Sequence, residues 1–157
     1  MNEEQQSNMQ NTILQELTRA YTKIPFNQML GLTIDHIDPQ YITVHFNMKN
    51  ELVGNFIYGI LHGGVISSVL DMAGGIAVMS SGINKHPDYT TEQLIDVIGK
   101  CTTVDLHVSF LSPGKGDSFK AKAWIVKSGH QISFTQMELR NQEETLVATA
   151  MGTYLMR

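Results

Sequence analysis

Hydrophobic residues recur at helical spacing in two segments of the chain. The first covers about residues 9–23 and ends before Pro25. Its apolar side chains share one helical face: Ile13, Leu14, Leu17 and Tyr21. The second segment, Gly63–Ser80, is the most apolar of the sequence. This pattern predicts an N-terminal helix and a long central helix that is buried over most of its surface.

The other apolar positions lie in short segments typical of β-strands. These segments are Leu32–Ile37, Tyr41–Met48, Thr102–Leu111, Phe119–Lys127, Gln131–Leu139 and Thr145–Met156. A turn at 38–40 joins the first two as a hairpin, and residues 112–117 turn the chain after the third. The short connections at 128–130 and 141–143 force the last three strands to be antiparallel neighbours.

Two further segments show no clear period. Lys49–Leu61 is expected to form an irregular loop, and Ser81–Lys100 a polar excursion with one helical piece near Thr91–Ile98. The chain length suits a single domain over residues 1–157, of class α+β. An antiparallel sheet wrapped around one long central helix lets both bury their apolar faces. This arrangement is the hotdog fold, and a split α+β sandwich is the alternative.

Composition and charge narrow the classes of function. Hydrophobic residues make up 42% of the chain, enough for a core, and the net charge of −4 argues against a nucleic-acid partner. The polar, acidic start does not resemble a signal peptide, and the apolar run Val65–Met79 is too short to span a bilayer. The single cysteine, Cys101, excludes an intramolecular disulfide and is either a free or a catalytic thiol. We expect a soluble, cytoplasmic protein.

The central helix carries a carboxylate where hydrocarbon is expected. In helical projection Asp71 lies on a strip of small or polar residues: Gly64, Ser67, Ser68 and Gly75. Asp is a poor helix former, and an unpaired buried carboxylate costs several kcal/mol, of order 3–5. One interpretation is that Asp71 faces solvent or is satisfied by a hydroxyl or a cation. The small neighbours favour another, in which Gly64, Ser67 and Ser68 line a ligand pocket beside it.

The start of the same helix is a second candidate element. At His62-Gly63-Gly64 the first amide N–H groups have no partner within the helix, and such donors bind anions or a developing oxyanion. Alternatively, the two glycines only permit a tight turn. Followed by a carboxylate about two turns later, the donor suits hydrolysis of an activated acyl group, in which Asp71 activates water or attacks directly.

These residues form part of a longer motif. The stretch Leu61–Asp71 resembles that of hotdog thioesterases of the phenylacetate-degradation type, whose acidic residue also lies nine positions after the histidine. The likeness continues in order through Pro25-Phe26-Asn27, Gly54-Asn55-Phe56, Thr103-Val104-Asp105-Leu106 and Leu111-Ser112-Pro113-Gly114. The sequence is also similar to the YigI-type acyl-CoA thioesterases of enterobacteria, which share Val53-Gly54-Asn55 and residues 60–66.

This resemblance implies a role for each matching residue. Gly63 would supply the N–H to the thioester oxygen, His62 would order the site, and Asp71 would be general base or nucleophile. Thr103 and Asn55 occupy positions of residues that orient water in relatives. The resemblance also implies medium- to long-chain acyl-CoA substrates and homodimers that share site elements across their interface and pair again into tetramers.

The remaining candidates are less specific. The other histidines lack metal-ligand spacing, so we expect neither a metal nor a cofactor, because CoA enters as part of the substrate. Lys100, Lys115 and Lys127 either contact the CoA phosphates or are solvated surface charges. Two other functions stay open. One is a non-catalytic acyl-CoA-binding or sensor module, and the other is a hotdog hydratase or dehydratase, whose usual His-based motif is absent.

Overall fold

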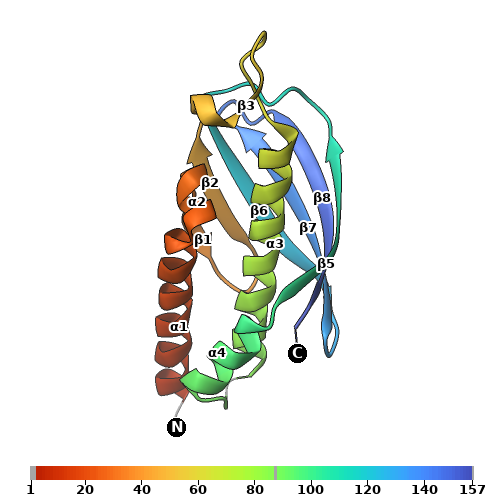
Figure 1. Cartoon of the computed structure of the whole chain (residues 1–157). Coiled ribbons are helices and arrows are strands. Elements are labelled where there is room, and N and C mark those ends of the chain that lie inside the picture. Colours follow the sequence, from red (N-terminus) through yellow and green to blue (C-terminus); the bar gives the residue numbers. More distant parts are fainter. Residues whose placement is uncertain (1–2, 87, 157) are drawn as a thin grey trace.

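A six-stranded antiparallel sheet curves around one long helix, α3 (Gly63–Lys85) (Figure 1). The structure is a computed structural model that describes residues 3–86 and 88–156. The other elements are α1 (Glu3–Lys23), α2 (Pro25–Leu30), β1 (Thr33–Ile37), β2 (Ile42–Asn47), a 3-10 turn (Asn50–Leu52), β3 (Val53–Asn55), β4 (Ile60–Leu61), α4 (Thr91–Gly99), β5 (Thr102–Phe110), β6 (Ser118–Ser128), β7 (Ile132–Asn141) and β8 (Leu146–Leu155). This confirms the predicted α+β class and the hotdog arrangement.

The strand order of the sheet is β1-β2-β6-β7-β8-β5. The predicted β1–β2 hairpin and the antiparallel neighbours β6, β7 and β8 are therefore confirmed. The pattern did not place β5, which lies at the edge beside β8. Residues 111–117 consequently cross from that edge to the middle of the sheet. The free side of β5 becomes a long edge of the molecule, while β1 forms the shorter opposite edge.

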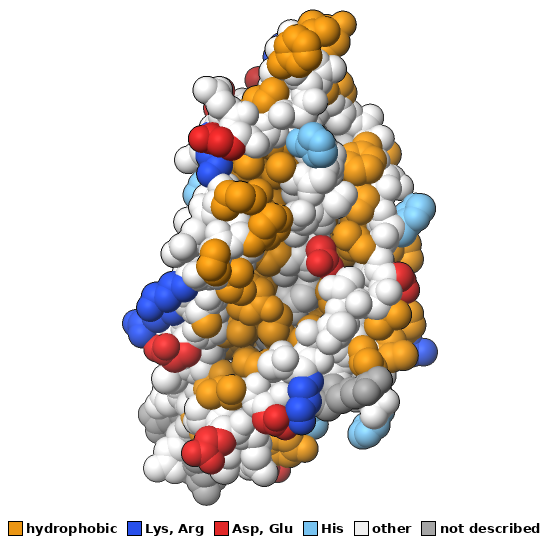
Figure 2. All heavy atoms as spheres, in the orientation of Figure 1, with side chains coloured by type: hydrophobic (Ala, Val, Ile, Leu, Met, Phe, Trp, Pro, Cys, Tyr) orange, Lys and Arg blue, Asp and Glu red, His pale blue; other side chains and the backbone are white. Residues whose placement is uncertain are grey.

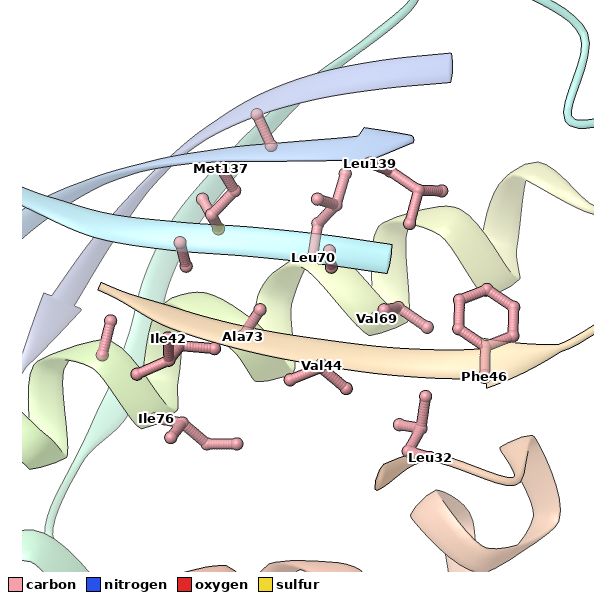
Figure 3. Packing of buried hydrophobic residues seen from close by; sticks show 14 of the residues in the cluster. Leu32, Ile42, Val44, Phe46, Val69, Leu70, Ala73, Ile76, Met137 and Leu139 are labelled. Carbon is pink, nitrogen blue, oxygen red and sulfur yellow. The ribbon is translucent and has the colours of Figure 1, made fainter. Parts of the chain in front are cut away.

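The core lies where α3 crosses the concave face of the sheet. Leu70, Ala73 and Ile76 point from the helix toward β2 and β7, and Val44 and Leu139 meet them from the strands (Figure 3). All five side chains are fully buried. The middle strands contribute small inward-facing residues, which let the helix approach the sheet closely: Ala121, Ala123, Ala148 and Ala150.

Three predicted boundaries were wrong. The central helix continues past Ser80 to Lys85, because Gly82 and Ile83 are buried by the surrounding chain. The first helix begins at Glu3 rather than near residue 9, whereas its predicted end before Pro25 is confirmed, and Pro25 also occupies the first turn of the short helix α2. The segment 49–61 is not an irregular loop but contains the β3–β4 hairpin, which projects from one end of the molecule (Figure 1).

The length argument against a membrane span also fails for α3. The helix has 23 residues and is long and apolar enough to cross a bilayer, but 61% of its most apolar window is buried inside the fold. Its hydrophobic side chains contact the sheet rather than an open surface. We therefore assign α3 as a core helix. A buried core helix can be as long and as apolar as a membrane-spanning one.

Two adjacent glycines of α3 differ in how much room surrounds them. A Cβ at Gly74 would lie 2.3 Å from the Tyr154 hydroxyl and 2.7 Å from the Met137 sulfur. A Cβ at Gly75 would approach no atom nearer than Tyr154 Cε1, at 3.7 Å. Gly74 therefore makes the space in which the Tyr154 side chain ends.

We predict opposite effects for alanine at these two positions. Gly75→Ala should raise the free energy of unfolding by up to about 1 kcal/mol, because alanine favours helix. Gly74→Ala should lower it by about 1–3 kcal/mol, because the core would be overpacked against Tyr154. Chemical denaturation of both variants measures the difference. Equal stability of the two would contradict the proposed close approach of Tyr154.

Candidate active site

A cavity of about 280 Å³ opens beside Asp71, where α3 faces the α1–α2 junction and the start of β5. Its lining mixes polar and apolar side chains: Tyr21, Phe26, Asn27, Ser68, Asp71, Met72, Gly75, Met79, Cys101, Thr103 and Tyr154. Among these described residues, Asp71 is the one carboxylate. The cavity therefore combines a single acidic group with a mostly neutral wall.

Two hydroxyl groups hold the Asp71 carboxylate. Thr103 Oγ1 donates to Asp71 Oδ1 at 2.9 Å, and the Tyr154 hydroxyl donates to the same oxygen at 3.1 Å. The Tyr154 hydroxyl also lies 2.9 Å from the Asp71 backbone carbonyl. Within the described residues both side-chain bonds end on Oδ1, which leaves Oδ2 able to accept a proton. One carboxylate oxygen of Asp71, Oδ1, is thus satisfied by hydroxyl groups, as the first interpretation of the sequence expected. The other oxygen, Oδ2, fits the interpretation in which Asp71 lies beside a ligand pocket.

Burial keeps the groups around Asp71 neutral. Burial first, and the Asp71 carboxylate second, raise the pKa of Tyr154 far above its ordinary value. Burial likewise raises the pKa of Tyr21 to about 12, with smaller contributions from Cys101 and Asp71. Both phenols stay protonated at physiological pH, so Tyr154 remains a hydrogen-bond donor to Asp71.

Cys101 is a cavity wall rather than a nucleophile. Burial, and then the charge of Asp71, raise the pKa of its thiol to about 11. At pH 7 the thiolate fraction is therefore on the order of 10⁻⁴. The catalytic-thiol interpretation does not fit this environment.

The start of α3 presents one unused amide. His62 is the N-cap, and its Nδ1 accepts the Gly64 N–H at 2.8 Å. The Val65 and Ile66 N–H groups donate to the His62 carbonyl at 3.0 and 3.2 Å. In the described part of the chain this leaves the Gly63 N–H without an acceptor. The arrangement orders the helix start around a free donor at Gly63, reinforced by the helix dipole.

His62 is itself held by close neighbours. Its N–H donates to the Leu52 carbonyl at 2.9 Å, and a Cβ at Gly54 would lie 2.5 Å from its Cα. Gly54 is therefore required for β3 to pass this close to the helix start. Because Nδ1 accepts a hydrogen bond, the neutral imidazole carries its proton on Nε2.

The two candidate elements are far apart within one chain. Gly63 and Asp71 are eight residues apart on α3, which is about 12 Å along the helix axis. A catalytic donor and a base must each lie about 3 Å from the reacting group. One copy of α3 cannot place both on the same carbonyl.

The structure separates the predicted pocket residues. Ser68 lines the cavity, while Ser67 and Gly64 are not among its lining residues. The Ser67 and Ser68 hydroxyls donate to the carbonyls of Gly63 and Gly64 at 3.0 and 2.8 Å, one turn back along α3. Asn55 Oδ1 accepts the Ile57 and Tyr58 N–H groups and thereby shapes the hairpin tip.

The predicted lysines do not form one cluster. Lys115 lies in the connection before β6, next to Gly114, whose carbonyl accepts the Leu61 N–H near the start of α3. Lys127 lies at the other end of β6, about 30 Å away along the strand. Lys100 pairs with Asp96 on α4. Among the described residues no group of three or more His, Cys, Asp or Glu side chains could hold a metal ion.

Sequence reasoning missed Tyr154 and Tyr21. Tyr154 occupies an inward position of β8 and reads as an ordinary core aromatic in the strand pattern. Only the register, in which Thr103 of β5 pairs with Tyr154, brings both hydroxyls to Asp71. Tyr21 reads as part of the apolar face of α1, and its position opposite Met79 depends on helix packing.

The sequence was compared with known families and proteins. Residues 58–148 match the model of the thioesterase superfamily. The chain is 33% identical over 132 residues to the medium/long-chain acyl-CoA thioesterase YigI of Salmonella typhimurium, covering 84% of this chain and 85% of that protein. It has the same identity and coverage with YigI of Escherichia coli.

Solved structures show the same fold. A Shewanella oneidensis protein described as related to the thioesterase superfamily superposes with a TM-score of 0.91 at 34% identity, covering 94% of this chain and 97% of that one. The PaaI protein of the Escherichia coli phenylacetic acid degradation operon superposes with a TM-score of 0.75 at 22% identity, covering 95% and 96% of the two chains. The second likeness concerns the fold alone.

We predict that the Cys101 thiol reacts slowly and only at high pH. Because its pKa is raised from 9.0 to about 11, the thiolate at pH 8 should be about a hundredfold scarcer than in the unfolded chain. The rate of modification by a disulfide reagent should rise up to about pH 11 in the folded protein. In guanidinium chloride it should level off near pH 9. A plateau near pH 9 in the folded protein would contradict this environment.

Proposed function

Because the chain belongs to the thioesterase superfamily, we propose that it hydrolyses acyl-CoA thioesters to the free acid and CoA at the Asp71 cavity. The observation that carries this proposal is the state of Asp71. It is a lone carboxylate in a neutral cavity, fixed through Oδ1 with Oδ2 available. A hydrolase needs such a group and no oxidant, metal or second acid in the cavity.

The chemistry follows from the two elements of α3. The thioester oxygen accepts the Gly63 N–H, which stabilises the negative charge that develops when the carbonyl is attacked. Asp71 takes a proton from the attacking water, or attacks the carbonyl carbon itself. Thr103 and Tyr154 keep the carboxylate in one orientation, and His62 keeps the helix start in place.

We propose that each complete site contains Gly63 of one chain and Asp71 of a second copy. The axial separation of about 12 Å within one helix supports this division. The nine-residue edge strand β5, which carries Thr103, has an unpaired side on which a second copy can dock. Val104, Phe110 and Leu111 on or after this strand are more than half exposed, as expected of a surface that is buried in a dimer.

A second surface supports pairing of dimers into a tetramer. Met151 and Phe134 lie on the outer face of β8 and β7 and are 63% and 44% exposed. The hairpin tip residues Phe56, Ile57 and Tyr58 are the most exposed large apolar side chains of the described chain.

Three finer features belong to the same proposal. Medium- to long-chain substrates are supported by the name of the YigI relatives and by the apolar side chains in the cavity wall, Phe26, Met72 and Met79. Of the predicted lysines, Lys115 is the better candidate for the CoA phosphates, because it lies near the start of α3 where the thioester binds. A cytoplasmic location fits the free thiol of Cys101, which a reducing compartment preserves.

The hydratase alternative has less support than hydrolysis. The usual His-based motif of hotdog hydratases is absent from the sequence, and no histidine of the same chain is among the described residues that line the Asp71 cavity. The non-catalytic binding module differs from the proposed hydrolase only in turnover. Release of CoA therefore distinguishes these functions.

We predict that Asp71→Asn lowers kcat by at least about 10²–10⁴-fold, because the general base or nucleophile is removed while the shape is kept. Free CoA released from acyl-CoA, detected with a thiol reagent, measures the loss. Asp96→Asn, which removes an exposed carboxylate from α4, is the matched control and should retain activity. Unchanged turnover in Asp71→Asn would exclude this residue from the mechanism, and no release by the wild type would favour the binding module.

A second prediction tests whether two chains share each site. Gly63→Pro removes the donor N–H but suits the first helical position, and His62 has φ −68° and ψ 135°, which a following proline accepts. Gly63→Pro and Asp71→Asn should each be inactive alone. Refolded together, they should recover about a quarter of wild-type activity, because half of the dimers are mixed and each contains one complete site.

The control for this experiment is Gly63→Ala, which keeps the N–H and whose Cβ would meet the Phe110 ring at 3.4 Å. Its activity should be within a few-fold of the wild type. Absence of recovery in the mixture, with normal folding of both variants, would show that the sites are not shared. That result would leave the Asp71 prediction standing.

A further inference from the structure

An apolar hollow lies between α1 and α4. This α1–α4 groove has a volume of about 480 Å³. Its apolar walls are Met9, Ile13, Leu17 and Ala20 of α1 and Ile95 and Ile98 of α4. Ile95 is 56% exposed, although its neighbour Leu94 is fully buried. Figure 2 shows hydrophobic side chains gathered in the hollow between α1 and α3 that leads toward α4.

The groove and the cavity are lined by neighbouring residues of the same elements. On α1, Tyr21 lines the cavity, while Ala20, the residue before it, and Leu17, one turn before it, line the groove. On the other side Cys101 lines the cavity and Ile98 the groove, and the Cys101 N–H donates to the Ile98 carbonyl at 3.1 Å. The two spaces therefore approach each other at Tyr21 and at Cys101.

Tyr21, the cavity residue that follows Ala20 of the groove on α1, makes a weak contact in the cavity wall. Its hydroxyl donates to the Met79 sulfur at 3.4 Å. A thioether is a weak acceptor and a methionine side chain is flexible. A passage between the two spaces at this point would therefore break a weak hydrogen bond and move a side chain that adapts easily.

We propose that the acyl chain of the substrate passes the Tyr21–Met79 contact and lies in the α1–α4 groove, so that α1 and α4 determine the preferred chain length. The inference rests on the proposed thioesterase function. The cavity alone is smaller than the roughly 300–1,000 Å³ typical of small-molecule sites, and the groove extends it into that range. Along α1 the groove runs from Ala20 to Met9, about 16 Å, a length suited to a fatty acyl chain.

The charge around the groove favours an alkyl occupant. Glu16 is the one charged residue in its described lining, and it is turned to Arg19 at the surface. The remaining polar residues, Thr12 and Thr91, lie at exposed positions of the two helices. Each methylene that enters such an apolar space improves binding about fourfold.

The test blocks the groove without touching the Asp71 cavity. Ala20→Trp places an indole in the groove from an exposed position of α1, and Ile95→Glu places a charge in it from α4. Gln15→Trp, an equally bulky change at an exposed position that lines a different hollow on α1, is the control. The substrates are hexanoyl-CoA and palmitoyl-CoA, the latter below its micellar concentration.

We expect Ala20→Trp to lower the ratio of kcat/KM for palmitoyl-CoA over hexanoyl-CoA by about 60-fold, the loss for three methylenes at about fourfold each. Ile95→Glu should act in the same direction, and Gln15→Trp should change neither substrate more than about twofold. An unchanged ratio in both groove variants overturns the proposal. An equal loss of kcat/KM on both substrates also overturns it. A shift in oligomeric mass with the ratio unchanged overturns it as well, and would assign the groove to contact with a second copy of the chain.

A binding measurement separates this inference from the proposed function. Titration of palmitoyl-CoA and hexanoyl-CoA into Asp71→Asn and into Asp71→Asn with Ala20→Trp gives affinities without turnover. The second substitution should weaken the binding of palmitoyl-CoA about 60-fold and leave the binding of hexanoyl-CoA unchanged. This result would support the groove even if the wild type hydrolysed nothing. Equal affinities in the two proteins would overturn it even if hydrolysis were confirmed.

Discussion

The mutual burial of α3 and the concave face of the sheet is the constraint on which the rest of the molecule depends. Exposing either apolar surface to water would be unfavourable, so each must cover the other. Small residues such as Ala121 and Ala148 let the helix and the sheet approach closely. A carboxylate on such a helix is tolerated only at the border of the contact. Asp71 lies at that border, and Tyr154 reaches it because Gly74 leaves the helix without a side chain at this point. The packing of the core thus sets the position and orientation of the proposed base.

The elements whose hydrophobic period is strong could be predicted from the sequence, namely α3, the β6–β8 meander and most of α1. Features that depend on partners distant in the sequence could not. The edge position of β5 follows from its pairing with β8, and the same register sets Thr103 against Tyr154, 51 positions later. The sequence pattern of Tyr154 is that of a core residue, because its ring is buried in the core. Only its hydroxyl belongs to the site. Asp71 and Gly63 were accessible to sequence reasoning because helix geometry alone places them.

That same geometry is the basis for proposing that two molecules share each site. A helix is rigid over the about 12 Å that separate Gly63 from Asp71, so no local rearrangement brings donor and carboxylate together. A symmetric dimer solves the problem, because a two-fold axis turns the start of one helix toward the middle of the other. The edge strand β5 then has two roles. It carries Thr103 to Asp71, and its unpaired side offers the surface through which a second copy would supply the missing amide.

The proposed chemistry and the proposed selection of substrate reside in different layers of the fold. Asp71, Thr103 and Tyr154 are fixed by the contact between helix and sheet, where a change of one methyl group is felt. Ala20 and Ile95, in contrast, are exposed side chains on helices outside that contact, and the core does not require their size. Substitutions on α1 and α4 can therefore alter the groove while the carboxylate keeps both of its hydroxyl donors. Under this proposal, substitutions can change the acyl chain that the fold accepts without changing the residues that hydrolyse the thioester.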